Sequence, residues 1–249
     1  MRQIIGLFFL SIILSSGFIS CKKDKEQGPD MGYNYFPIKV GSYIVYNVDS
    51  FHYYNTPTII DTFKFQLKEK IQSTYLDNQN RTTLRLERYI RNYDPIIPYS
   101  ALPWIFRDVW AANRTTTTAE KVEENVRYIK LAFAVREGQS WNGNAQNTNE
   151  GLTYTYQFFD QPRTIGGTAF DSVLQVNQEN DENLILKKLY IERYARKIGM
   201  VFKQVIDVHS QPDPGWNSAQ LSAFYAQPIL QRVTSGFQYS YIYTSSGTE

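Results

Sequence analysis

Hydrophobic and polar residues alternate along most of this chain, and the alternation has a period of two. It is clearest in residues 62–71 and 81–90, where most alternate positions are apolar and most positions between them are charged or polar. This period is typical of β-strands with one buried face and one face in water. The stretch LDNQN, at 76–80, lies between the two runs and predicts a hairpin turn. The residues predicted to share the core face of this hairpin are Phe63, Phe65, Leu67, Leu84, Leu86 and Ile90, with Gln66 on the wet face.

Several further runs have the character of short strands, and stretches rich in Gly, Pro, Asn or Ser separate most of them. These runs are residues 42–51, 103–110, 126–135, 152–159, 169–176, 184–194, 200–208 and 237–244. We therefore expect an all-β fold of about ten strands, mainly an antiparallel sheet that is curled or barrel-like. Aromatic residues make up 15% of the chain, with 19 tyrosines, which also favours strands.

One or two short helices are expected beside the sheet. Residues 217–227 combine a capping residue, Asn217 or Ser218, with good helix formers, and Pro228 would end the helix. Residues 119–130 could begin as a second helix, although their pattern also suits strands. The sequence leaves that choice open.

The beginning of the chain has the pattern of an export signal. A short basic start precedes an apolar run at 4–14, which is too short to span a bilayer and is typical of a secretory signal peptide. Small residues lead to Cys21, the only cysteine, and this stretch resembles the lipobox of bacterial lipoproteins. We expect residues 1–20 to be the signal peptide and Cys21 to be the lipidated residue that attaches the protein to a membrane. An ordinary secreted protein with a free thiol is the alternative.

The residues after Cys21 predict where the anchor would lie. CKKDKE resembles the export signal of surface-exposed lipoproteins in Bacteroidota-type bacteria, which implies the outer membrane and its cell-surface side. Residues 21–32 contain few large apolar side chains and predict a flexible tether, followed by one β-rich domain at 33–249. Without Arg2 the formal charge of +2 falls to +1, so no nucleic-acid partner is expected.

Four stretches resemble a group of uncharacterised Bacteroidota-type lipoproteins. They are YFPIKVGSYIVYNVDS (35–50), EGQSWNGN (137–144), AFDSVLQV (169–176) and ERYARKIGMVFKQV (192–205). The first contains the F-P-x-x-x-G-x-x-x-x-Y pattern of that group, with Ile44 where tryptophan is usual. The resemblance covers most of residues 35–209. It implies a β-rich fold and an envelope location, and it implies no catalytic residue and no ligand.

Metal and cofactor chemistry have little support in the residues. Only His52 and His209 are available as imidazole ligands, and no metal site or cofactor is expected. The acidic run at 177–184 lacks the central glycine and ligand spacing of a calcium loop, so it predicts a hairpin turn. The sequence has neither a G-x-S-x-G nucleophile motif nor a glycine-rich phosphate loop.

Acid–base catalysis has two candidate sets of residues. Asp207 and His209 share one face of a strand, where solvated strand polarity explains them better than a catalytic pair does. Glu69, Glu87 and Glu192 could form a glycosidase pair if the fold brought two of them close together. We assign no catalytic residue on this basis.

Aromatic residues carry the remaining functional signal. Alternate positions from Phe237 to Tyr243 place four rings on one face, which suits a core. Two proline-rich segments, 93–106 and 211–225, contain Trp104 and Trp216 as possible ligand contacts, and such segments either close a barrel end or form a binding surface. The sequence predicts an outer-membrane-anchored lipoprotein in a non-catalytic binding or structural role, with a glycan or a protein as the possible ligand. The alternative is a surface hydrolase acting on glycan or peptide.

Overall fold

Twelve antiparallel strands form a single sheet within residues 28–54 and 60–249, the part of the chain that this computed structural model describes. The strands are β1 (Ser42–Tyr53), β2 (Ile60–Leu76), β3 (Thr82–Asn92), β4 (Ile105–Arg114), β5 (Thr118–Glu123), β6 (Val126–Ala132), β7 (Ser140–Asn142), β8 (Thr153–Ile165), β9 (Thr168–Glu182), β10 (Leu186–Ala195), β11 (Gly199–His209) and β12 (Ser235–Thr248). The predicted signal peptide, Cys21 and the first part of the tether lie outside the described residues.

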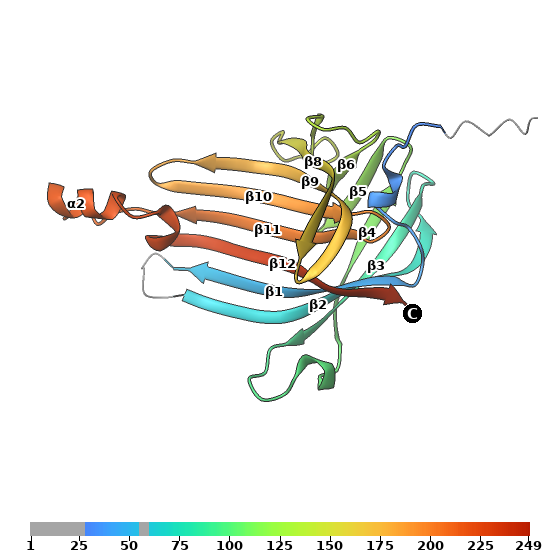
Figure 1. Cartoon of the computed structure of the whole chain (residues 1–249), viewed down its shortest axis with the longest axis horizontal. Helices are drawn as coiled ribbons and strands as arrows, with labels where there is room; N and C mark the ends of the chain where they lie inside the picture. Colours follow the sequence, from blue (N-terminus) through green and yellow to red (C-terminus); the bar gives the residue numbers. More distant parts are fainter. Residues whose placement is uncertain (1–27, 55–59) are drawn as a thin grey trace, which may run out of the picture. The chain divides into compact units, whose positions relative to one another are not determined.

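The spatial order of the strands divides the sheet into two halves. Strands β1 to β6 follow one another as neighbours, strands β7 to β12 do the same, and the halves join through the pairing of β1 with β12 (Figure 1). The two edges come together where the Ile129 N–H donates to the Gly143 carbonyl at 2.9 Å and the Trp141 indole N–H donates to the Ile129 carbonyl at 2.9 Å. The sheet is therefore a nearly closed barrel, which confirms the predicted all-β class.

The turns have the chemistry that the sequence suggests. In the β2–β3 turn the Asp77 carboxylate accepts from the Gln79 and Arg81 backbone N–H groups, which confirms the predicted hairpin. Residues 119–130 form the β5–β6 hairpin, in which Glu124 and Asn125 both have positive φ angles. Two successive residues with positive φ suit a tight hairpin turn and do not fit an α-helix. The segment therefore forms two strands, and the helix considered for it is not present.

Beside short 3₁₀ turns at Tyr33–Tyr35, Tyr99–Ala101 and Ile229–Gln231, the described residues contain one α-helix, α2 (Ser218–Tyr225). Asn217 caps it as predicted: its side chain accepts from the Ala219 and Gln220 N–H groups, and the Gln220 side chain accepts from the Asn217 N–H. This reciprocal pair satisfies N–H groups that the first helical turn leaves without partners.

The predicted core face of the β2–β3 hairpin is only partly correct. Leu67, Leu84 and Leu86 are buried and Phe65 and Ile90 are half-buried, whereas Phe63 is 49% exposed. The prediction for Gln66 was also incomplete. Its side chain is 9% exposed, donates to Asn47 at 2.8 Å and accepts from Arg91 at 2.7 and 2.9 Å, so it is tied into the sheet instead of freely solvated.

Candidate binding cleft

An open cleft of about 920 Å³ lies inside the barrel, and inward-facing side chains of several strands form its walls. Because side chains alternate between the faces of a strand, β1 contributes Val48, Ser50 and His52 at every second position. The other residues used below are Phe63, Phe65, Arg88, Trp110, Glu123, Lys203, Tyr239 and Tyr241. The volume lies in the range of sites for small organic ligands.

A row of rings runs along β12, and its members Tyr239 and Tyr241 line the open cleft together with His52, whereas Phe237 continues the row beyond the lining. The rings of Phe237 and Tyr239 stack with a 10° interplanar angle and 6.2 Å between centroids, and Tyr239 and Tyr241 lie 5.6 Å apart. His52 meets Phe237 at 6.1 Å and Phe63 edge-on at 5.7 Å. The sequence predicted a core face for this row. Of its members only Tyr243 is a core residue, while the other three are half-buried beside the cleft.

The floor of the open cleft contains charged side chains that are buried and paired. Arg88 is 1% exposed; its guanidinium lies 3.5 Å from the centre of the Trp110 ring and donates to Asp108 at 2.9 and 3.1 Å. The Arg88 Nε also donates to Glu69 at 3.2 Å, and Lys121 donates to the other oxygen of Glu69 at 2.8 Å. Glu69 and Arg88 face each other across β2 and β3, so strand register makes this contact.

A second set of pairs continues the floor toward β10 and β11. Glu192 is fully buried, with Lys130 Nζ at 2.6 Å and Lys203 Nζ at 3.4 Å, and it accepts a hydrogen bond from the Tyr194 hydroxyl at 2.6 Å. Glu123 lies 3.2 Å from both lysines. We call the two sets together the charged layer. Its four cations are Arg88, Lys121, Lys130 and Lys203, and its four carboxylates are Glu69, Asp108, Glu123 and Glu192.

The three glutamates of the charged layer, Glu69, Glu123 and Glu192, all have a lowered pKa, which favours their ionised form. Burial opposes the ionisation of Glu69, but Lys121 and Arg88 outweigh it and hold the pKa of the Glu69 carboxyl below its ordinary value. Burial likewise opposes ionisation of Glu192 and Glu123, and the neighbouring lysines lower the pKa of both carboxyls. A general acid needs a raised pKa, so this arrangement does not suit a glycosidase pair.

The remaining catalytic candidates are not brought together either. Glu87 is not part of the charged layer. Its carboxylate accepts hydrogen bonds from the Arg85 side chain at 3.2 Å and from the Tyr89 hydroxyl. Asp207 accepts from the Tyr190 hydroxyl at 2.6 Å, and His209 is exposed at the end of β11. Within residues 28–54 and 60–249, no hydrogen bond joins Asp207 to His209.

Trp104 lies in the proline-rich segment between β3 and β4, which projects from the barrel instead of filling it (Figure 1). The ring is half-buried, with the Arg91 guanidinium 4.2 Å and the Lys68 ammonium 5.3 Å from its centre. These contacts lie outside the open cleft. A ligand contact through Trp104 stays a prediction.

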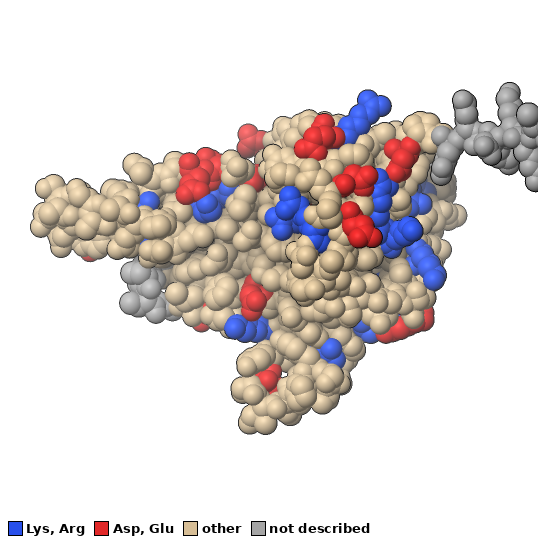
Figure 2. All heavy atoms as spheres, in the orientation of Figure 1, with Lys and Arg blue, Asp and Glu red and all other residues tan. Residues whose placement is uncertain are grey.

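Trp216 lies in a different projection, the segment that carries α2. It is 36% exposed and meets the edge of the Phe224 ring at 5.2 Å. Residues 214–231 contain no charged side chain, and this end of the molecule is almost uniformly uncharged on the face in Figure 2. Trp216 does not line the open cleft, and its contact with a ligand also stays a prediction.

The residues that build the open cleft were not predicted as a site from the sequence, and those of them that were named, such as Phe63 and Phe65, were assigned to the core. Arg88, Trp110, Lys203 and Tyr239 come from four strands, and only the closure of the sheet brings them to one place. One feature of the sequence could have indicated the open cleft: a lysine or arginine lies on the same strand face as large aromatic residues.

Two further properties bear on function. Among the residues that the structure describes, no group of three or more His, Cys, Asp and Glu side chains is placed to hold a metal ion. Within the same residues, the helices fall short of the length and apolar character that crossing a membrane requires.

Comparison with known proteins gives limited results. No family model matches the sequence, and no curated protein matches it. The chain is similar to a crystal structure from Bacteroides fragilis that is described as an exported protein with a YmcC-like fold. The two share 11% identity, the match covers 86% of this chain and 98% of the other, and the TM-score is 0.43.

Proposed function

We propose that this protein is a non-catalytic binding lipoprotein of the outer membrane, anchored through Cys21, that takes a glycan into the open cleft. The observation that supports this best is the row of half-buried rings along β12, of which Tyr239 and Tyr241 line the cleft together with the polar and cationic side chains of Ser50 and Lys203. A sugar has apolar C–H faces that pack on rings, while its hydroxyl groups accept and donate hydrogen bonds to polar side chains.

The rings are held in place before a ligand arrives. Each one contacts the next along β12, and His52 and Phe63 fix the far end of the row. A ring that is already positioned loses little conformational entropy on binding, so more of the contact energy contributes to affinity. The paired charges of the floor fit a binding site better than an acid–base site, because the pKa of the buried glutamates is held low.

A glycan array probed with the full chain tests the binding proposal, followed by calorimetry with the best oligosaccharide. We expect Tyr239→Ala and Phe63→Ala to weaken binding about fivefold or more, since a stacked ring contributes on the order of 1–3 kcal/mol. Phe158 is a matched control because its ring is 41% exposed on β8 and does not line the open cleft. If Phe158→Ala weakens binding as much as Phe63→Ala, the open cleft is not the site.

The anchor is tested separately. Metabolic labelling with a palmitate analogue should tag the protein, and Cys21→Ser should abolish the tag, because no other cysteine is present. Continued labelling of the Cys21→Ser variant would contradict lipidation at this residue.

A further inference from the structure

A second cavity, here called the end cavity, lies inside the barrel on the other side of the charged layer. It has a volume of about 330 Å³. Along β1 the open cleft is lined from Val48 to His52 and the end cavity from Ser42 to Tyr46. Along β3 the open cleft begins at Arg88, whereas Leu84 and Leu86 line the end cavity. The charged layer therefore divides the barrel interior into two separate sites.

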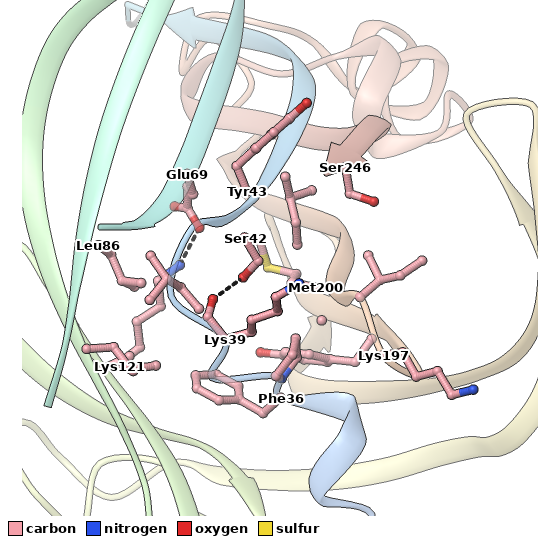
Figure 3. A pocket seen from close by; sticks show the side chains of 18 of the residues that line it. Phe36, Lys39, Ser42, Tyr43, Glu69, Leu86, Lys121, Lys197, Met200 and Ser246 are labelled. Carbon is pink, nitrogen blue, oxygen red and sulfur yellow. Dashed lines mark hydrogen bonds and ion pairs between the residues drawn. The ribbon is translucent and has the colours of Figure 1, made fainter. Parts of the chain in front are cut away.

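The walls of the end cavity are mainly apolar. They include Phe36, Ile44, Ile71, Leu84, Leu86 and Met200. Figure 3 shows Phe36, Leu86 and Met200 around this space, with the Glu69–Lys121 ion pair at one side. Because the charged layer has equal numbers of cations and carboxylates, the floor offers no unpaired charge to a ligand. An apolar chain is the chemistry that these walls accommodate.

The mouth of the end cavity is cationic. Lys39 and Lys197 both line it and both are exposed. Within residues 28–54 and 60–249 neither ammonium group pairs with a carboxylate, and the polar contact of the Lys39 ammonium is with the Thr248 hydroxyl at 3.4 Å. In Figure 3 the side chain of Lys197 points away from the other labelled residues. Lys39 is therefore the better-placed partner for an anion at the mouth.

We propose that the end cavity binds a single-chain amphiphile, with its apolar chain between Leu86 and Met200 and its anionic head group at Lys39. A volume near the lower end of the range for ligand sites fits one chain better than the two chains of a phospholipid. Charge complementarity at Lys39 selects an anionic head over a neutral or cationic one. This site does not depend on glycan binding in the open cleft.

Calorimetric titration of the delipidated full chain with dodecanoate, dodecyl phosphate and dodecyltrimethylammonium tests both parts of the proposal. We expect saturable binding of at least one anionic probe, and binding of the cationic probe that is weaker by about tenfold or more. The two anions distinguish a carboxylate from a phosphate head group. Equal binding of the cationic probe, or no binding of either anion, would overturn the proposal.

Two pairs of variants locate the ligand. Lys39→Glu should weaken binding of the anion by about tenfold, while Lys39→Arg should preserve it. Met200→Trp fills the end cavity and should abolish binding. Phe202 does not line this cavity and packs against the hydrophobic cluster around Val201, so Phe202→Trp should leave binding intact. Retained affinity in a folded Met200→Trp variant would refute the site. If Met200→Trp does not fold, the two variants at the exposed Lys39 still test the site. Equal affinities of Lys39→Glu and Lys39→Arg for the anion would refute the proposed site.

Discussion

The charged layer predicts that removing one buried charge is far more costly than removing an exposed one. In Glu192→Gln the side chain keeps its shape, but Lys130 and Lys203 lose the carboxylate that lies 2.6 and 3.4 Å from their ammonium groups. The two lysines then share Glu123 alone. Leaving an uncompensated charge in a buried site costs about 3–5 kcal/mol.

This cost can be measured by thermal unfolding followed through tryptophan fluorescence. At about 2–4 °C per kcal/mol for a domain of this size, we expect Tm to fall by about 6–20 °C. Glu182→Gln is the matched control, because Glu182 pairs with Lys187 at the surface and its side chain is 51% exposed. Its loss should cost less than about 1 kcal/mol.

A double variant separates charge imbalance from simple loss of packing. Lys130→Met together with Glu192→Leu removes one cation and one carboxylate, and leaves Lys203 paired with Glu123. We expect the pair to be less destabilised than the sum of the two single variants, since apolar replacements of a buried ion pair are often tolerated. Equal losses for Glu192→Gln and Glu182→Gln would refute the reasoning about burial.

Three other outcomes are expected. Leu67→Ala should lower the unfolding free energy by about 2–5 kcal/mol in urea titrations, and Phe63→Ala by much less, because Leu67 is fully buried and Phe63 is 49% exposed. Gly236→Ala should destabilise more than Gly167→Ala in thermal melts: both glycines have positive φ angles, but only at Gly236 would the added Cβ collide with backbone, 2.2 Å from the Asp207 carbonyl oxygen. Acid titrations followed by circular dichroism should show stability retained above the ordinary pKa of glutamate, 4.5, and lost as the pH falls further. Burial opposes ionisation of Glu192, but its neighbouring lysines outweigh burial and lower the pKa of this carboxyl in the folded state.

The strand pattern could be predicted from the sequence because alternation is a local signal. The β2–β3 hairpin and the Asn217 cap both depend on residues within a few positions of one another. The placement of Gln66 failed because its partners Asn47 and Arg91 come from other strands, and no local pattern shows them.

Alternation separates two faces, but it does not say which face becomes the interior of a barrel. On β11 the apolar residues Ile206 and Val208 pack with Val233 in one cluster, while Lys203 on the alternate face lines the open cleft. The interior is therefore the more polar face in this region. The charged layer as a whole could not be predicted, since Glu123 and Lys130 of the β5–β6 hairpin meet Glu192 and Lys203 of β10 and β11 only when the sheet curls into a barrel.

The pairing of β1 with β12 has a consequence for folding kinetics. Every other strand pair in the sheet joins successive strands, and most of these hairpins close short loops at little entropic cost, the long β11–β12 connection that carries α2 being an exception. The β1–β12 pairing instead connects residues that are far apart in the sequence, such as Val45 and Thr244, which are separated by 199 positions. The two six-stranded halves can thus form early from local contacts, and the search for this one central register is the slow step expected to set the overall folding rate.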